Sequence, residues 1–385
     1  MKKAGLSEEL GKRVAAARKR LKMNQEALAR EAGFKSHQII SQIEKGRREV
    51  KVWELSALSR ILRVEMSQLL GVEEPKSPAQ VLWRQRPSTG IEVKEVEFLQ
   101  CCERYHRLEQ LCGIKSSDVL PQFKVDPARL KYSDVERIAH SVSGQMRLGS
   151  RPAVALEREL EEKYGVKIWH MPIEDGSAAS SKGDFGLAIL MNSNEAPWRR
   201  NSSFAHELFH LITWDAVPPQ QLREDASLWE HVEKMAEGFA SHLLLPEQEV
   251  RVVFANHLDP ENKTVSFTDI IEMAREFDVS TTMFLYRLRR LRLIKEEDAQ
   301  KILADPDFRA QDKKTMRAHW WTPPEIPPRF VRLAYLAYKK GNLARAKLAE
   351  YLNVSLIDLS ETLLDYGFDD SDTYDAQIHT DSGNS

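Results

Sequence analysis

The sequence predicts a mainly α-helical protein with one small β-sheet, which is an α+β fold. Apolar residues recur at helical spacing through most of the chain, and only two short segments, within 165–171 and 184–192, read as strands. A length of 385 residues exceeds one ordinary small domain, so we expect two or three. The predicted order is a five-helix N-terminal domain, a central domain that holds the sheet, and a helical C-terminal region.

The composition narrows the class of protein. An apolar content of 42% is enough to bury real cores, and no apolar run approaches the roughly 18 residues of a membrane span. The charged N-terminus lacks an apolar export signal. Cys101, Cys102 and Cys112 lie close together without the spacing of metal ligands. We therefore expect reduced thiols, a cytoplasmic location and no membrane association.

Charge is distributed unevenly along the chain. Residues 1–72 hold 16 basic and 8 acidic residues, a net charge of +8, and the remainder holds 40 basic and 50 acidic residues, a net charge of −10. A basic module on an acidic body indicates either an electrostatic footprint for nucleic acid at one end or a merely solvated basic surface.

Residues 1–72 divide into about five short helices. Asn24 is placed to cap a helix that ends at Gly33, and a second helix follows the turn "GFKS" and ends at Gly46. Two short helices joined through a glycine-containing turn form a helix-turn-helix unit, whose second helix can enter the major groove of DNA.

Polar residues on these helices are candidates for DNA contacts. The side chains expected to meet base edges or phosphates on the second helix are His37, Gln38, Ser41 and Gln42. Those expected to meet phosphates are Gln25, Lys35, Lys45, Arg47 and Arg48. An interaction module that binds no DNA is the alternative.

The segments "NQEALAREAGF" and "ISQIEKGRR" resemble the XRE-type helix-turn-helix domain of phage-repressor-like regulators. The turn is one residue longer than the commonest form of that family, which leaves the register of the base-contacting residues open. The resemblance implies that residues 1–72 bind a double-stranded DNA operator. Because such modules usually read two half-sites, we expect a homodimer.

Residues 73–133 are predicted to be a linker and helical connector. Three prolines and mixed polarity mark residues 71–90 as a linker or arm. Residues 91–113 carry an apolar stripe at helical spacing, namely Phe98, Cys101, Tyr105, Leu108 and Cys112. This helix could mediate dimerisation or pack on its own body.

The segment "SSFAHELFHLI" at 202–212 contains an H-E-x-x-H pattern on a predicted helix. His206 and His210 are four residues apart, so their imidazoles are neighbours that can reach one zinc ion at about 2.0–2.1 Å. Glu207 lies beside them and is the candidate general base toward a metal-activated water. A chance match in a chain of this size has a probability of roughly 3%, so a third ligand is required.

The helix "SLWEHVEKMAEGFASHLLLP" offers that third ligand. Glu233 and Glu237 lie beside its buried stripe, and the small residues Ala236, Gly238 and Ala240 would let it approach the H-E-x-x-H helix closely. Three protein ligands with one open position are typical of catalytic zinc. Glu233 fits as the third ligand, with Glu237 or His231 as alternatives.

The segments "RRNSSFAHELFHLI" and "EKMAEGFASHLLLP" together resemble the ImmA/IrrE metallopeptidases, over roughly residues 134–295. The resemblance implies a zincin-like domain with His206, His210 and Glu233 as ligands of Zn2+. It departs from the family at Phe209, where glycine is usual, and at Glu237, where asparagine is common. Family members studied as proteases cut a helix-turn-helix repressor.

Two segments are expected to border the cleft. The strand Gly186–Asn192 would be an edge to which an extended peptide adds as a further strand. Residues 174–186, "EDGSAASSKGDFG", are rich in glycine and serine, which is typical of a mobile lid or of a disordered hairpin tip.

The remaining chain completes the prediction. Residues 296–368 form a helical C-terminal region, and residues 369–385 an acidic disordered tail. The leading hypothesis is a transcriptional regulator whose zinc metallopeptidase cleaves a repressor-like protein, or its own chain, in a stress or phage-related response. The alternatives are a ligand or stress sensor without proteolysis, and an antitoxin-like protein that binds a toxin partner.

Overall fold

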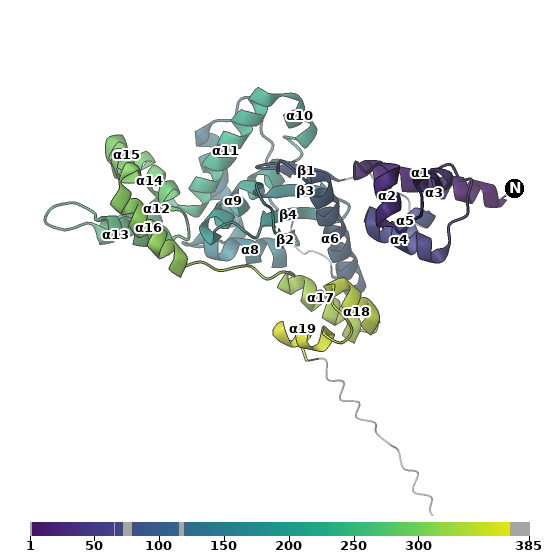
Figure 1. Cartoon of the computed structure of the whole chain (residues 1–385). Coiled ribbons are helices and arrows are strands. Elements are labelled where there is room, and N and C mark those ends of the chain that lie inside the picture. Colours follow the sequence, from purple (N-terminus) through teal and green to yellow (C-terminus); the bar gives the residue numbers. More distant parts are fainter. Residues whose placement is uncertain (1, 65, 72–78, 115–118, 370–385) are drawn as a thin grey trace, which may run out of the picture. The chain divides into compact units, whose positions relative to one another are not determined.

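A computed structural model of the chain describes residues 2–64, 66–71, 79–114 and 119–369 (Figure 1). It confirms the predicted fold class, since helices dominate and one four-stranded sheet is present. The chain divides into two compact units, one of residues 1–106 and 116–325, and one of residues 107–115 and 326–385. None of the helices in the described part of the chain is long and apolar enough to span a membrane.

The N-terminal region has the five predicted helices. They are α1 (Lys2–Arg20), α2 (Gln25–Glu31), α3 (His37–Glu44), α4 (Val52–Leu62) and α5 (Met66–Leu70). The Asn24 side chain caps α2 as predicted, because it accepts a hydrogen bond from the amide of Ala27. The Ser36 hydroxyl caps α3 in the same way by accepting from the amide of Gln38.

Two features hold α1, α2 and α3 together. The Glu44 carboxylate at the end of α3 accepts from Arg18 Nε at 2.6 Å and from Gln25 Nε2 at 2.7 Å, which joins all three helices. Gly11 lets α1 approach the end of α3. A Cβ atom at Gly11 would overlap the Ile43 carbonyl oxygen and lie 2.7 Å from that of Glu44.

The predicted linker contains an element that the sequence did not reveal. Residues 80–83 form strand β1 (Gln80–Trp83), so the expectation of a plain linker or arm across 71–90 is wrong at this point. The predicted helix after it is present as α6 (Ile91–Cys112). It packs on its own body, as one of the two alternatives proposed, because the Tyr105 hydroxyl donates to Glu161 at 2.7 Å and its ring meets Trp169 edge-on.

The sheet also contains β2 (Lys167–Met171), β3 (Ala179–Gly183) and β4 (Gly186–Asn192). Its order is β1-β3-β4-β2, with β2 and β4 parallel and the other pairs antiparallel (Figure 1). The predicted edge strand, β4, is therefore an interior strand between β3 and β2. Residues 174–186 are not a lid, because they include β3, which pairs on both sides.

Helices α7 (Tyr132–Met146), α8 (Pro152–Glu162), α9 (Pro197–Thr213), α10 (Pro219–Glu224) and α11 (Ala226–Leu244) accompany the sheet. Helix α9 contacts β3 and β4, and α11 contacts both α9 and α7. Gly238 was expected to ease the contact of α11 with α9, which is wrong. A Cβ atom there would lie 2.9 Å from the ring of Tyr132, so this glycine faces α7.

The first unit continues through α12 (Glu247–His257), α13 (Phe267–Glu276), α14 (Thr281–Arg290), α15 (Glu296–Ala304) and α16 (Pro306–Ala318). The second unit holds α17 (Pro328–Lys339), α18 (Arg345–Leu352) and α19 (Leu359–Asp365). The predicted helical region 296–368 is helical, but its helices are shared between the two units. The predicted acidic tail lies, beyond Asp369, outside the described residues.

Substituting Gly11 by alanine is expected to destabilise the N-terminal helices, because the added methyl group would collide with the backbone of α3. Amide hydrogen exchange in α1 and α3 of the full chain measures the effect. The matched control is Gly144→Ala on α7, where an added Cβ meets no described atom within 4 Å. That change should be neutral or stabilising by about 0.5–1 kcal/mol. Equal protection in both variants would contradict the close approach.

Candidate metal centre and nucleic-acid interface

Helix α9 supplies the H-E-x-x-H residues from the interior of the domain. It begins at Pro197, whose fixed φ suits the first turn of a helix. Every residue from 202 to 213 is buried, because α9 contacts the sheet on one side and α11 on another. His206 and His210 therefore share a helix face that is closed to bulk water.

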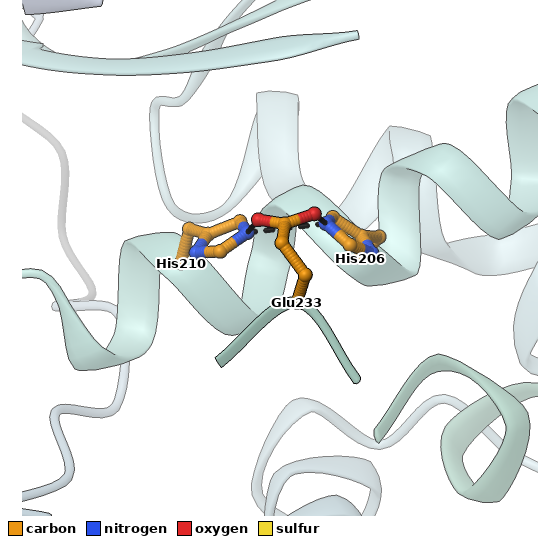
Figure 2. A group of neighbouring side chains, drawn as sticks. All are labelled: His206, His210 and Glu233. Atoms are coloured by element: carbon orange, nitrogen blue, oxygen red, sulfur yellow. Dashed lines mark hydrogen bonds and ion pairs between the residues drawn. The ribbon is translucent and has the colours of Figure 1, made fainter. Parts of the chain in front are cut away.

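Helix α11 places Glu233 between the two histidines (Figure 2). Glu233 Oε2 lies 3.1 Å from His206 Nε2, and Glu233 Oε1 lies 3.2 Å from His210 Nε2. The two Nε2 atoms are 3.1 Å apart. Ligand atoms at about 2.05 Å from a tetrahedral ion would be separated by about 3.3 Å. The three ligand atoms thus have the mutual distances expected at three corners of a tetrahedron around one ion.

The other candidate ligands lie elsewhere. Glu237 is exposed, and His231 Nε2 lies 2.9 Å from the Leu130 carbonyl oxygen. Of the predicted ligands, the structure thus brings His206, His210 and Glu233 together.

Another group of possible ligands consists of His257, Asp269 and Glu272. Asp269 already serves the capping box of α13 through Ser266, so this partly exposed group has a structural role.

Three side chains of the centre, His206, Glu207 and Glu233, have pKa values far from their ordinary ranges. Burial lowers the pKa of His206 to about 3, which favours the neutral imidazole that binds metals. Burial alone would raise the pKa of Glu233, but hydrogen bonds with His206 and His210 hold it at about 2. Glu233 is therefore an anion at neutral pH.

Glu207 has a different environment from Glu233. It is fully buried, and neither carboxylate oxygen has a hydrogen-bond partner among the described residues. Burial raises the pKa of Glu207 to about 7, against the opposing effects of His210, Ser180 and Arg84. A carboxyl group with such a pKa can accept and return a proton near neutral pH.

Arg84 belongs to the site although no sequence motif marks it. It follows β1 directly, and its Nη1 donates to Ser203 Oγ at 2.9 Å. Ser203 is buried on α9, one turn before His206. The Arg84 charge also lowers the pKa of His206 and of Glu207. Sequence analysis missed this residue because it lies in the predicted linker, more than one hundred positions from α9.

A hollow of about 730 Å³ adjoins these residues. Its lining includes Arg84, Ser202 and Glu237, and Glu237 lies one turn beyond Glu233 on α11. Its aromatic residues are Tyr132, Trp198 and Tyr286. Its cations besides Arg84 are Arg199, Lys234, Arg289 and Arg290. Three of these cations pair with nearby carboxylates, so the walls are less positive than the residue types suggest.

The unusual Phe209 of the H-E-x-x-H segment is a packing residue. Its side chain is fully buried, and its ring centroid lies 5.5 Å from that of Phe239 on α11. This contact between two rings strengthens the packing of α9 on α11. The departure from the family pattern therefore fills the core beside the candidate ligands and leaves their positions undisturbed.

The side chains predicted to contact DNA differ in their exposure to solvent. On α3, His37, Gln38 and Gln42 are exposed and Ser41 is half-buried. Around the helix, the exposed cations are Lys35, Lys45 and Arg47.

The other two predicted contacts have partners within the chain. Arg48 Nη2 donates to the buried Glu54 at 2.7 Å, and Gln25 donates to Glu44. The exposed polar face of α3 is thus the better candidate surface.

Comparison with known proteins places both domains. Residues 14–69 match the family described as helix-turn-helix, and residues 161–289 match the Peptidase_M78 family, described as the IrrE N-terminal-like domain. The second match includes α9 and α11 but not Arg84. No curated protein matches the chain.

Among solved structures, a transcriptional regulator of Mycobacterium tuberculosis is 15% identical, with a TM-score of 0.31. The match covers 48% of this chain and 51% of that one, so it spans about half of the regulator's length. The chain joins an XRE-type helix-turn-helix DNA-binding domain at residues 14–69 to a Peptidase_M78 domain, of the IrrE-like type, at residues 161–289.

Proposed function

We propose that the protein is a transcriptional regulator with a zinc-dependent peptidase that cleaves a repressor-like protein or its own chain. The observation that carries this proposal is the position of Glu233, with its two oxygens 3.1 and 3.2 Å from the histidines that flank Glu207. A DNA-binding domain in the same chain links the cleavage to gene control.

The donor set fits zinc. Two imidazoles and one carboxylate are ligands that zinc accepts, and three protein ligands leave one position for water or substrate. A bound zinc ion supplies Lewis-acid polarisation and lowers the pKa of its water to about 7. The buried site excludes bulk water, which strengthens every charge interaction within it.

Glu207 is the proton carrier in this proposal. In hydrolysis, its carboxylate accepts a proton from the attacking water and delivers it to the nitrogen of the leaving amine. The carboxylate has no competing hydrogen-bond partner among the described residues, so it is free to turn toward that water. Arg84 places a positive charge beside α9 in the resting protein, through its hydrogen bond to Ser203.

The helix-turn-helix domain would bring the peptidase to an operator by binding its DNA. The polar face of α3 presents Gln38 and Gln42, whose amides can read base edges in the major groove. The exposed cations Lys35, Lys45 and Arg47 would contact phosphates. A homodimer would match two half-sites, and a cytoplasmic location follows from this role.

Replacing Glu207 by glutamine should leave zinc bound but reduce cleavage by at least about 100-fold, because the ligands remain and the proton carrier is lost. Zinc content and cleavage of the protein's own chain and of co-encoded repressors are measured together. His206→Ala is the companion variant and should lose both zinc and cleavage. Target-gene control that survives Glu207→Gln but not His206→Ala would instead favour a sensor without proteolysis.

The same substitution should stabilise the metal-free protein at neutral pH. Folded Glu207 has a pKa of about 7 against an ordinary 4.5, so the folded state binds more protons between these values and loses stability as the pH rises through them. The advantage of Glu207→Gln should grow across this window to at most about 3 kcal/mol.

Urea unfolding of chelator-treated protein at about pH 5 and pH 8 measures this advantage. Glu297→Gln, at an exposed position of α15, serves as the control and should show no such growth. If the Glu207→Gln variant gained the same unfolding free energy at both pH values, the pKa of Glu207 would not be raised in the folded protein.

Gln38→Ala and Gln42→Ala should each weaken operator binding by about 1–3 kcal/mol, because each removes a base contact. Affinity for DNA from the protein's own upstream region is compared with affinity for random DNA of equal length. Gln300→Ala, exposed on α15, is the matched control. Unchanged affinity in both α3 variants would remove α3 as the reading helix.

A further inference from the structure

The edge of β3 is the place where an extended peptide could join the sheet beside the metal centre. Strand β3 contacts α9, the helix that carries Glu207. On one side β3 pairs with β4, which is an interior strand, so only the opposite side of β3 can accept a further strand. Peptide recognition by strand addition uses such an edge, because backbone hydrogen bonds hold the peptide with little regard to its sequence.

That edge is already occupied by the protein's own chain. Strand β1 pairs antiparallel with β3 from Gln80 opposite Lys182 to Trp83 opposite Ala179. The pairing continues beyond the strand, since the Arg84 amide donates to the Ala178 carbonyl at 3.0 Å and the Ser177 amide donates to that of Gln85 at 3.1 Å. Residues 80–85 therefore form a peptide-like segment along the whole edge.

This segment runs past the catalytic helix. Leu82 pairs with Ser180 in the middle of β3, the strand that contacts α9. Two residues later, Arg84 reaches Ser203, one turn before His206 on α9. A substrate strand in the same place would pass the same groups. Residues 80–84 thus lie where the proposed peptidase needs its substrate.

The segment lies outside the part of the chain that matches the peptidase family. The Peptidase_M78 match covers residues 161–289, which include β2, β3 and β4 but not β1. The matched region therefore contains three strands of the sheet, and the region that follows the helix-turn-helix domain supplies the fourth. Because β1 is tethered to the same chain, it competes with a free peptide at an effective concentration that can reach the millimolar range.

Burial holds β1 in place at rest. Val81, Leu82 and Trp83 are 4%, 3% and 5% exposed. Leu82 belongs to the core that includes α9 and α11, and the Trp83 indole donates to Glu95 of α6 at 2.8 Å. On the outer side, the Val81 carbonyl accepts from Arg223 of α10 at 2.9 Å. A free peptide must displace these contacts before it reaches β3.

We propose that residues 80–85 act as a resident substrate mimic, which occupies the peptide-binding edge of β3 and keeps the peptidase latent until the segment is displaced. The proposal rests on the proposed function because it assumes that the domain is a peptidase. The occupation of the β3 edge by residues 80–85 does not depend on that assumption. The displacing partner would be an extended segment with apolar residues at the positions of Val81 and Trp83, and another at that of Leu82. Alternation of these side chains on the two faces of β1 sets that pattern.

The test uses the full chain in two opposed variants. Leu82→Asp introduces a charge into the core and should release the segment, because a buried unpaired carboxylate is strongly disfavoured. Val154→Asp, at a site on α8 that is 70% exposed, is the control for the added charge.

The second variant locks the segment and keeps the test valid if the released protein fails to fold. The Val81 carbonyl points away from β3 to Arg223, so Val81 and Ser181 form a non-hydrogen-bonded pair, with Cα atoms about 4.5 Å apart. That separation suits a disulfide. The paired substitutions Val81→Cys and Ser181→Cys should therefore fix β1 on oxidation and release it on reduction. Oxidised and reduced wild type is the control for the native cysteines.

Binding is measured first, with a fluorescein-labelled peptide of residues 79–86, AQVLWRQR, in the Glu207→Gln background. The Leu82→Asp protein should bind it at least about tenfold more tightly than the wild type or Val154→Asp, because the tethered competitor is removed. The oxidised lock should bind none, and reduction should restore the wild-type level. Equal binding by the released, wild-type and locked proteins would overturn the proposal.

Cleavage of fluorescent casein by the zinc-loaded proteins with Glu207 intact is measured second. The proposal expects the fastest cleavage from Leu82→Asp, intermediate rates from the wild type and the reduced double-cysteine variant, and the slowest cleavage from the oxidised double-cysteine variant. Cleavage of the chain itself within residues 80–86 would show a substrate instead of a resident mimic and would overturn the inference. Peptide binding in the expected order without any casein cleavage would leave the resident segment standing and contradict the peptidase.

Discussion

The packing of α11 across α9 is the constraint on which the site depends. It sets Glu233 between His206 and His210, at 3.1 and 3.2 Å from their ring nitrogens. The contact is filled by apolar side chains, including the rings of Phe209 and Phe239 at 5.5 Å. A shift of one helix turn along α11 would bring Glu237 to the histidines in place of Glu233. The close-packed core therefore decides which carboxylate faces the two histidines.

The same burial gives the polar groups their chemical character. Two imidazoles and two carboxylates lie in an interior that disfavours charge, and the fold resolves the conflict differently for each. Glu233 keeps its charge because it pairs with the histidines. Glu207 has no described hydrogen-bond partner, and burial raises its pKa to about 7, so it holds its proton up to about that pH. One carboxyl group is thus suited to hold a cation and the other to move a proton. A buried carboxylate without partners is unfavourable for folding, which is typical of a residue retained for function.

The sheet connects this site to the rest of the chain. Three strands belong to the Peptidase_M78 region, and the fourth comes from residues that follow the DNA-binding domain. Arg84 extends this connection to α9 itself. A change that moves the N-terminal region could therefore reach the metal centre through one short strand.

Local sequence patterns by themselves determined the helices and most of the candidate metal centre. The four-residue spacing of His206 and His210 places both on one helix face whatever the fold, and the apolar stripe of the next helix narrowed the third ligand to a few residues. Only the tertiary structure placed Glu233 between the histidines, made β4 interior and turned Gly238 toward α7. It also revealed β1 and Arg84. A four-residue strand among prolines carries almost no periodic signal, and its partner β3 lies about one hundred residues away, so its stability comes from contacts that no local pattern records.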